Sequence, residues 1–117
     1  MTITLYGIAN CDTVKKARRW LDERGVDYTF HDYKKLGVPP PQLDRWLDEA
    51  GWQMLLNRNG TTWRKLDAGV QAGVVDAGSA RALMLEQPSV IRRPVVEMGE
   101  RLLVGFDEAR YEQAFAA

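Results

Sequence analysis

The chain has 117 residues, of which 45% are hydrophobic and 27% are charged, and its sixteen basic side chains balance sixteen acidic ones. This size and composition are typical of one globular domain, so we expect residues 1–117 to form a single domain. A net charge of zero gives no electrostatic reason to bind nucleic acid or an anionic membrane. No apolar run could span a bilayer, and the N-terminus lacks a leader pattern, so we expect a cytoplasmic protein.

The cysteine and histidine content limits the chemistry further. The chain has one cysteine, Cys11, and one histidine, His31. A single cysteine cannot form an intramolecular disulfide, which agrees with a reducing compartment. Two such residues are too few for a structural zinc site, so we expect neither a metal nor a tightly bound cofactor. We assign no role to His31.

The first third of the chain has a β-α-β pattern. Alternating residues predict a strand at 2–6, and a run rich in β-formers predicts another at 26–33. Between them, a helix starts at Asp12 and is followed by Gly25. One stripe of this helix contains Thr13, Ala17, Trp20, Leu21 and Arg24. This order predicts a right-handed crossover and a parallel strand pair.

The middle of the chain predicts helices. Three prolines at 39–41 precede a helix that ends at Gly51, and shorter helices follow with a turn at 59–60. Ser79 is the expected N-cap of a further helix, which ends at Pro88. We expect the four tryptophans to pack in the core rather than to form a binding stripe: Trp20, Trp46, Trp52 and Trp63.

β patterning returns near the end. Residues 95–96 and 102–104 predict two strands joined by a turn at 99–100, and 106–116 predict a final amphipathic helix. The complete order is βαβ, a helical insert, a β-hairpin and a helix. The sequence therefore predicts an α/β protein.

Cys11 lies in the expected loop between the first strand and the first helix. Unpaired backbone N–H groups and the helix dipole favour an anion at a helix N-terminus, and the thiolate is the reactive form of cysteine. Lys15, one turn further on, adds positive charge nearby. The loop also lies at the carboxyl end of a parallel strand, where α/β sheets commonly bind ligands. We therefore expect Asn10, Asp12 and Thr13 to contact a substrate.

Two alternatives apply to this loop. A lone cysteine is more often an inert small hydrophobe in a core, but the polar sequence around Cys11 favours a functional role. The Asp12 carboxylate either disfavours a neighbouring thiolate or caps the helix.

Four segments of the chain resemble a known family: Y-G-I-A-N-C at 6–11, L-L-N-R-N-G-T-T-W-R-K-L at 55–66, I-R-R-P-V-V at 91–96 and R-L-L-V-G-F-D-E at 101–108. In order and spacing they are similar to the arsenate reductase ArsC family, which includes the Spx regulators and the YffB-type proteins. The resemblance is greatest for the YffB-type branch. It implies a thioredoxin-like fold with a helical insertion.

The resemblance also implies roles for particular residues. Cys11 matches the nucleophile, and Arg93 matches an oxyanion-binding arginine, so we assign catalytic roles to both. The resemblance implies a cis peptide bond at Pro94, next to the cysteine loop. A second arginine is expected near 57–59, where Arg58 matches with a shift of one position because Asn57 aligns with the arginine.

The chain departs from the arsenate enzymes at two further places. The third arginine is missing at 104–105, and Gly7 replaces a histidine. These departures predict weak or absent arsenate reduction. Spx members with a redox switch carry a second cysteine where this chain has Val14, which excludes an internal disulfide switch.

These observations predict a monomeric thiol-dependent reductase that acts on a disulfide, a glutathionylated molecule or an oxyanion. A second thiol must resolve the intermediate, because the chain has no other cysteine. We expect glutathione or a similar small thiol as co-substrate, with glutaredoxin as a further partner that the resemblance implies. The alternative is an Spx-like module that binds RNA polymerase through its surface.

Overall fold

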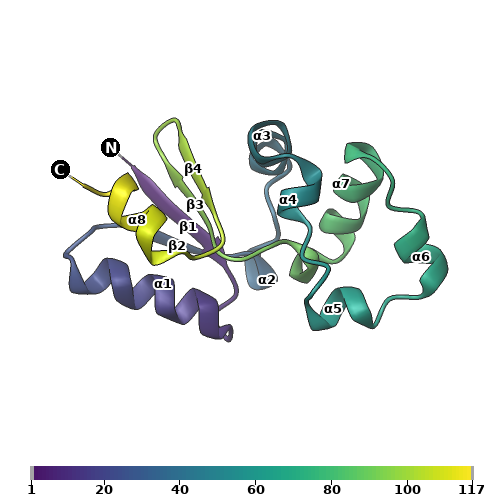
Figure 1. Cartoon of the computed structure of the whole chain (residues 1–117), viewed down its shortest axis with the longest axis horizontal. Coiled ribbons are helices and arrows are strands. Elements are labelled where there is room, and N and C mark those ends of the chain that lie inside the picture. The colour runs from purple at the N-terminus through teal and green to yellow at the C-terminus, as the bar shows by residue number, and fades with distance from the viewer. Residues whose placement is uncertain (1, 117) are drawn as a thin grey trace. The chain divides into compact units, whose positions relative to one another are not determined.

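The computed structural model describes residues 2–116. It contains the predicted strands near both ends of the chain, with helices between them (Figure 1). The chain starts with β1 (Ile3–Gly7), α1 (Asp12–Glu23) and β2 (Thr29–Asp32), and it ends with β3 (Val95–Met98), β4 (Arg101–Val104) and α8 (Glu108–Ala114). Between these parts lie α2 (Tyr33–Leu36), α3 (Pro40–Ala50), α4 (Trp52–Leu55), α5 (Thr61–Arg64), α6 (Ala68–Ala72), α7 (Ala77–Glu86) and a 3₁₀ helix (Pro88–Val90).

The four strands form one sheet in the order β2-β1-β3-β4. β1 is parallel to β2 and antiparallel to β3, and β3 is antiparallel to β4. The predicted thioredoxin-like fold, a βαβ unit followed by a ββα unit with a helical insertion, is therefore confirmed.

The described contacts divide the chain into two compact units. The first contains the residues up to Asp32 and those from Arg93 onwards, and the second contains Tyr33–Arg92. The first unit holds the sheet, α1 and α8, whereas the second is the helical insertion. The expectation that 1–117 form a single domain stays a prediction.

α1 and α8 cover the same face of the sheet in the first unit. Leu5, Val96 and Leu103 are neighbours on that face, because they pair across β1, β3 and β4. Their side chains form one buried cluster with residues from the two helices: Val14, Ala17, Trp20, Leu21 and Tyr111. The buried stripe of α1 thus includes Val14, whereas Thr13 and Arg24 of the predicted stripe are exposed and lie at the two ends of the helix.

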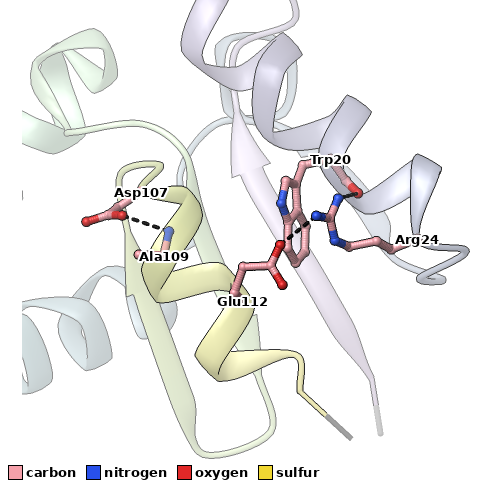
Figure 2. Close-up of polar contacts among 5 residues, drawn as sticks. All are labelled: Trp20, Arg24, Asp107, Ala109 and Glu112. Atoms are coloured by element: carbon pink, nitrogen blue, oxygen red, sulfur yellow. Dashed lines mark hydrogen bonds and ion pairs between the residues drawn. The ribbon is translucent and has the colours of Figure 1, made fainter.

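A polar contact also links α1 to α8 (Figure 2). The Arg24 guanidinium carbon lies 3.8 Å from the centre of the Trp20 ring, and Arg24 Nη2 donates to Glu112 Oε1 at 2.6 Å. At the start of α8, the Asp107 carboxylate accepts the Ala109 N–H at 3.0 Å and caps the helix. The final helix is therefore shorter than the predicted 106–116.

The second unit has its own core. α3 contacts both α4 and α7, and the 3₁₀ helix contacts α2, α5 and α7. The largest fully buried side chains of this unit come from five of these elements and the segments beside them: Tyr33, Leu43, Trp46, Leu55, Leu56, Met84, Val90 and Ile91. An isolated bridge between Leu56 and Ile91 joins the segment after α4 to the end of the unit.

The boundaries of β2 and α7 also differ from the sequence predictions. β2 begins at Thr29 and ends at Asp32, because its pairing partner β1 ends opposite it at Gly7. α7 is capped by Asp76, whose carboxylate accepts the Ser79 N–H at 2.8 Å, while the Ser79 hydroxyl accepts the Asp76 N–H at 3.1 Å. Ser79 is therefore the reciprocal partner in a capping box and not the N-cap. Among residues 2–116, no helix is both long and apolar enough to cross a membrane.

Candidate active site

Cys11 is the N-cap residue of α1. Its backbone is extended, with φ of −143° and ψ of 123°, and its carbonyl accepts the Lys15 N–H at 2.9 Å in the first helical hydrogen bond. The side chain makes no capping hydrogen bond, and the thiol is half-buried against the edge of the α1 cluster. Cys11 therefore stands at the N-terminus of the 12-residue helix, where free N–H groups and the positive end of the helix dipole favour an anion.

The polar residues around Cys11 are exposed. Asn10 lies in the loop, while Asp12, Thr13 and Lys15 lie on the solvent side of the first helical turns. Asp12 is the first helical residue rather than the cap, so its capping interpretation is wrong: Cys11 occupies that position. A carboxylate in the first turn is stabilised by the helix dipole, as a thiolate would be.

The sheet register places the Arg93–Pro94 pair near the cysteine loop. Tyr6 pairs with Val95 in antiparallel register, so Pro94 lies beside the carboxyl end of β1, from which the loop leads to Cys11. The Arg93–Pro94 peptide bond is cis, as the resemblance implies. Pro94 is buried and Arg93 is half-buried. The fold thus brings the cysteine loop and the predicted arginine to the same edge of the sheet.

The end of β4 completes this edge. The Gly105 N–H donates to the Pro94 carbonyl at 2.8 Å, and the Gly105 carbonyl accepts the Tyr111 hydroxyl at 3.2 Å. Gly105 has a φ of 79°, which side-chain-bearing residues rarely adopt. Burial raises the pKa of Tyr111, which keeps its phenol protonated as a donor. Gly105 therefore takes part in two backbone hydrogen bonds, and residues 104–105 contain no counterpart of the third arginine of the arsenate enzymes.

Arg58 lies in the second unit, in the turn between α4 and α5. Its guanidinium carbon is 5.7 Å from the Trp52 ring centre and 5.8 Å from that of Trp63. The neighbouring Asn57 shapes the turn, because its Oδ1 accepts the Asn59 N–H at 3.2 Å. The amide that aligns with the family's arginine therefore has a structural role, and the exposed cation of this turn is Arg58.

The surroundings of Arg58 differ from the sequence prediction. Trp20 and Trp46 are buried as predicted, but Trp52 and Trp63 are only half-buried and flank an arginine. The available signal was a tryptophan on each side of Arg58, six residues before it and five residues after it. Nearby, Arg92 donates from Nε to the Met54 carbonyl at 2.9 Å.

Curated proteins similar to this chain cover nearly its whole length. An uncharacterised protein of Haemophilus influenzae is 40% identical over 114 residues, which is 97% of this chain and 99% of that protein. The global transcriptional regulator Spx 2 of Bacillus anthracis is 26% identical over 108 residues, which is 91% of this chain and 81% of that protein.

Two solved structures are similar in both sequence and fold. A YffB protein is 56% identical with a TM-score of 0.93, and the match covers 98% of this chain and 100% of that one. An arsenate reductase (ArsC) related protein from Brucella melitensis is 56% identical with a TM-score of 0.76, over 100% of this chain and 97% of that one. The ArsC family model matches residues 6–114. The chain therefore belongs to the ArsC family.

Proposed function

We propose that this protein is a thiol-dependent reductase in which Cys11 is the nucleophile and glutathione or a similar small thiol is the co-substrate. The observation that carries the proposal is the place of the only cysteine, at the N-cap of α1 and at the sheet edge that also holds Arg93. The helix N-terminus favours the thiolate, and arginine suits a carboxylate or an oxyanion. Family membership supports the same chemistry.

The reaction on a glutathionylated substrate has two steps. The Cys11 thiolate attacks the glutathione sulfur, a new S–S bond forms, and the substrate leaves as a thiolate that takes a proton from water. Free glutathione thiolate then attacks the Cys11–glutathione disulfide, which releases oxidised glutathione and restores the Cys11 thiolate. Across the two steps, the substrate–glutathione disulfide and one glutathione thiolate become a substrate thiolate and oxidised glutathione, so one disulfide bond is broken for each one formed. The chain needs this external thiol because it has no second cysteine.

The other predicted residues have supporting roles in this proposal. Arg93 holds an anionic group of the substrate, and Arg58 is a second candidate anchor. Asn10, Asp12, Thr13 and Lys15 line the approach to the sulfur, while Pro94 shapes the neighbouring backbone. We propose glutaredoxin as an alternative resolving partner, and a monomer acting in the cytoplasm.

Mass spectrometry of protein purified without reductant tests this function. We expect a glutathione-sized adduct on Cys11 that dithiothreitol removes, and reduction of a glutathionylated substrate by wild-type protein. The Cys11→Ser variant should lose both. An unmodified Cys11 that also fails to exchange with oxidised glutathione would overturn the proposal.

A second candidate is a regulatory module that binds RNA polymerase, which the similarity to Spx 2 favours. Such a module could not use an internal disulfide switch, because Val14 stands where the second cysteine would be. Capture of RNA polymerase that persists in Cys11→Ser, with no thiol exchange in the wild type, would favour this function over the reductase.

A further inference from the structure

Arg58 lies between two tryptophans of the second unit. Its guanidinium carbon is nearly equidistant from the ring centres of Trp52 and Trp63, at 5.7 and 5.8 Å. Both distances fall within the range of about 6 Å over which an aromatic face attracts a cation. Two rings acting together therefore restrict where this exposed cation lies.

Two arginines of the first unit are also placed over aromatic rings, but their N–H groups are used inside the protein. Arg24 lies over Trp20 and donates to Glu112 at 2.6 Å, and Arg18 donates from Nε to the Tyr28 hydroxyl at 3.1 Å. Such contacts hold elements of the fold together, as the link between α1 and α8 does (Figure 2).

Arg58 differs from these two arginines in its polar contacts. Within residues 2–116 its guanidinium has the two ring contacts and no hydrogen-bond or ion-pair partner. Aromatic rings attract a cation without supplying a carboxylate or carbonyl acceptor, so the planar set of five N–H donors stays available to a ligand. This combination of restraint and free donors suits bidentate recognition of a carboxylate.

Backbone contacts hold the segments that carry Arg58 and the two tryptophans. Trp52 is the first residue of α4, and the Trp63 carbonyl in α5 accepts the Gln71 side-chain amide at 2.8 Å. The turn that carries Arg58 is held by the Asn57 N–H, which donates to the Val90 carbonyl at 2.8 Å. A held backbone and two flanking rings reduce the side-chain freedom that the arginine would otherwise lose on binding.

The local charge favours an anion. Residues 51–66 contain no aspartate or glutamate, and they include Arg64 and Lys65 in addition to Arg58. The segment therefore carries three positive charges and no negative one.

We propose that Trp52 and Trp63 are positioning residues that hold Arg58 ready to bind a carboxylate of a glutathione-like anion. This inference rests on the proposed function for the identity of the ligand. The two tryptophans act through the arginine, so their effect on binding depends on the negative charge of the ligand and on the presence of Arg58.

Nuclear magnetic resonance titration of the ¹⁵N-labelled full chain tests the proposal in a Cys11→Ser background. The probe is S-methylglutathione, which has two carboxylates and no free thiol, and the control is its dimethyl ester, which keeps the amino group but has no carboxylate. We expect the indole signals of Trp52 and Trp63 to shift with the acid and not with the ester. Arg58→Gln should weaken binding by about fivefold, the size expected of an exposed ion pair.

The tryptophan variants decide the positioning role. Trp52→Leu and Trp63→Leu should each weaken binding of the acid, and neither should weaken it further once Arg58 is glutamine. Trp63→Phe keeps an aromatic face and should retain most of the affinity. Arg24→Gln is the matched control, because it removes another ring-stacked arginine whose donors are already used.

The outcomes separate this inference from the proposed function. If Cys11 forms a glutathione adduct but the acid moves neither indole signal, the positioning role is wrong and the function stands. The positioning role is also wrong if the tryptophan variants weaken binding of the acid and of the ester equally. It is likewise wrong if they weaken binding of the acid as much in the Arg58→Gln background as in its absence. If the indole signals respond to the acid but Cys11 never exchanges with oxidised glutathione, the function is wrong and the anion site stands.

Discussion

Val14 fills the space next to Gly7. A Cβ atom built on Gly7 would lie 2.9 Å from Val14 Cγ2 and 3.2 Å from Val14 Cγ1. Gly7 ends β1 and Val14 is fully buried on α1, so this contact sets how closely the helix approaches the strand before the cysteine loop.

A side chain at position 7 should therefore be destabilising. Gly7→Ala is expected to lower the free energy of unfolding by about 1–3 kcal/mol, because it overpacks a filled core. Urea denaturation followed by circular dichroism measures the change. The double variant with Val14→Ala should lose less unfolding free energy than the sum of the two single variants. The methyl group added at position 7 partly fills the cavity left at Val14, and the smaller side chain at position 14 removes the crowding. Strict additivity would show that the two residues do not share this space.

Arsenate should be reduced weakly or not at all. The arginine expected after β4 is replaced by a glycine with a φ of 79°, and the amide at 57 serves the turn. Each missing charge-assisted hydrogen bond should cost about 1.5–3 kcal/mol of oxyanion stabilisation, and several together lower the rate by orders of magnitude. An assay with glutathione and glutaredoxin measures the rate. Turnover equal to that of a dedicated arsenate reductase would contradict this prediction.

Arg93 should give Cys11 a preference for anionic disulfides. We expect Arg93→Ala and Arg93→Lys to slow the reaction with oxidised glutathione more than the reaction with an uncharged disulfide of similar size, because only the former offers carboxylates to a guanidinium fork. Rapid mixing with each disulfide, followed by alkylation of the remaining Cys11 thiol at set times, measures both rate constants. Arg101→Ala, an exposed change at the start of β4, is the control. Wild-type rate ratios in both Arg93 variants would exclude this role.

The Tyr111 hydroxyl should stabilise the end of β4. Tyr111→Phe removes the hydrogen bond to the Gly105 carbonyl and should cost about 1 kcal/mol of unfolding free energy. The same change at Tyr28, whose half-exposed hydroxyl accepts from Arg18, should cost less because water can replace it. Denaturant melts of the two variants make the comparison, and a larger loss at Tyr28 would contradict it.

The capping box of α7 should make stability depend on acid pH. The backbone N–H and then the hydroxyl of Ser79 hold the pKa of Asp76 below its ordinary value. A lowered pKa in the folded state means that the stabilisation is complete above the unfolded-state pKa of about 3.9 and is lost as the pH falls through the folded-state value.

The stability difference between wild type and Asp76→Ala should therefore shrink as the pH is lowered below about 4. Denaturant melts from pH 2 to pH 6 measure it. Asp67→Ala is the control, because Asp67 is the N-cap of α6 and its side chain makes no capping hydrogen bond. A difference that stays constant over this range would rule out the carboxylate as its source.

The fold could be predicted from the sequence where local patterns and tertiary packing agree. The first helix, the hairpin turn at 99–100 and the glycine at 51 that ends α3 all have distinctive local signals. The end of β2 could not be predicted, because it depends on the length of β1, its partner strand. Asp76 and Ser79 are both good capping residues three positions apart, so only the hydrogen bonds distinguish the cap from its partner.

The candidate site was predictable to a similar degree. The sequence placed Cys11 at the start of a helix, and the sheet register then brought Pro94 to the same edge. The partners of Arg58 were not predictable, because an aromatic spacing typical of a core is also compatible with rings that flank a turn.

The chain order of the first unit has a consequence for its biosynthesis. β1 must pair with β3, but the whole of the second unit lies between them in the sequence. The second unit is continuous, so it can assemble on the ribosome as soon as Arg92 has emerged, whereas the central strand pair must wait for the last quarter of the chain. Until then β1 has only β2 as a partner, and a two-stranded pair is marginally stable in water. The segment that bears Cys11 is thus synthesised first and fixed last.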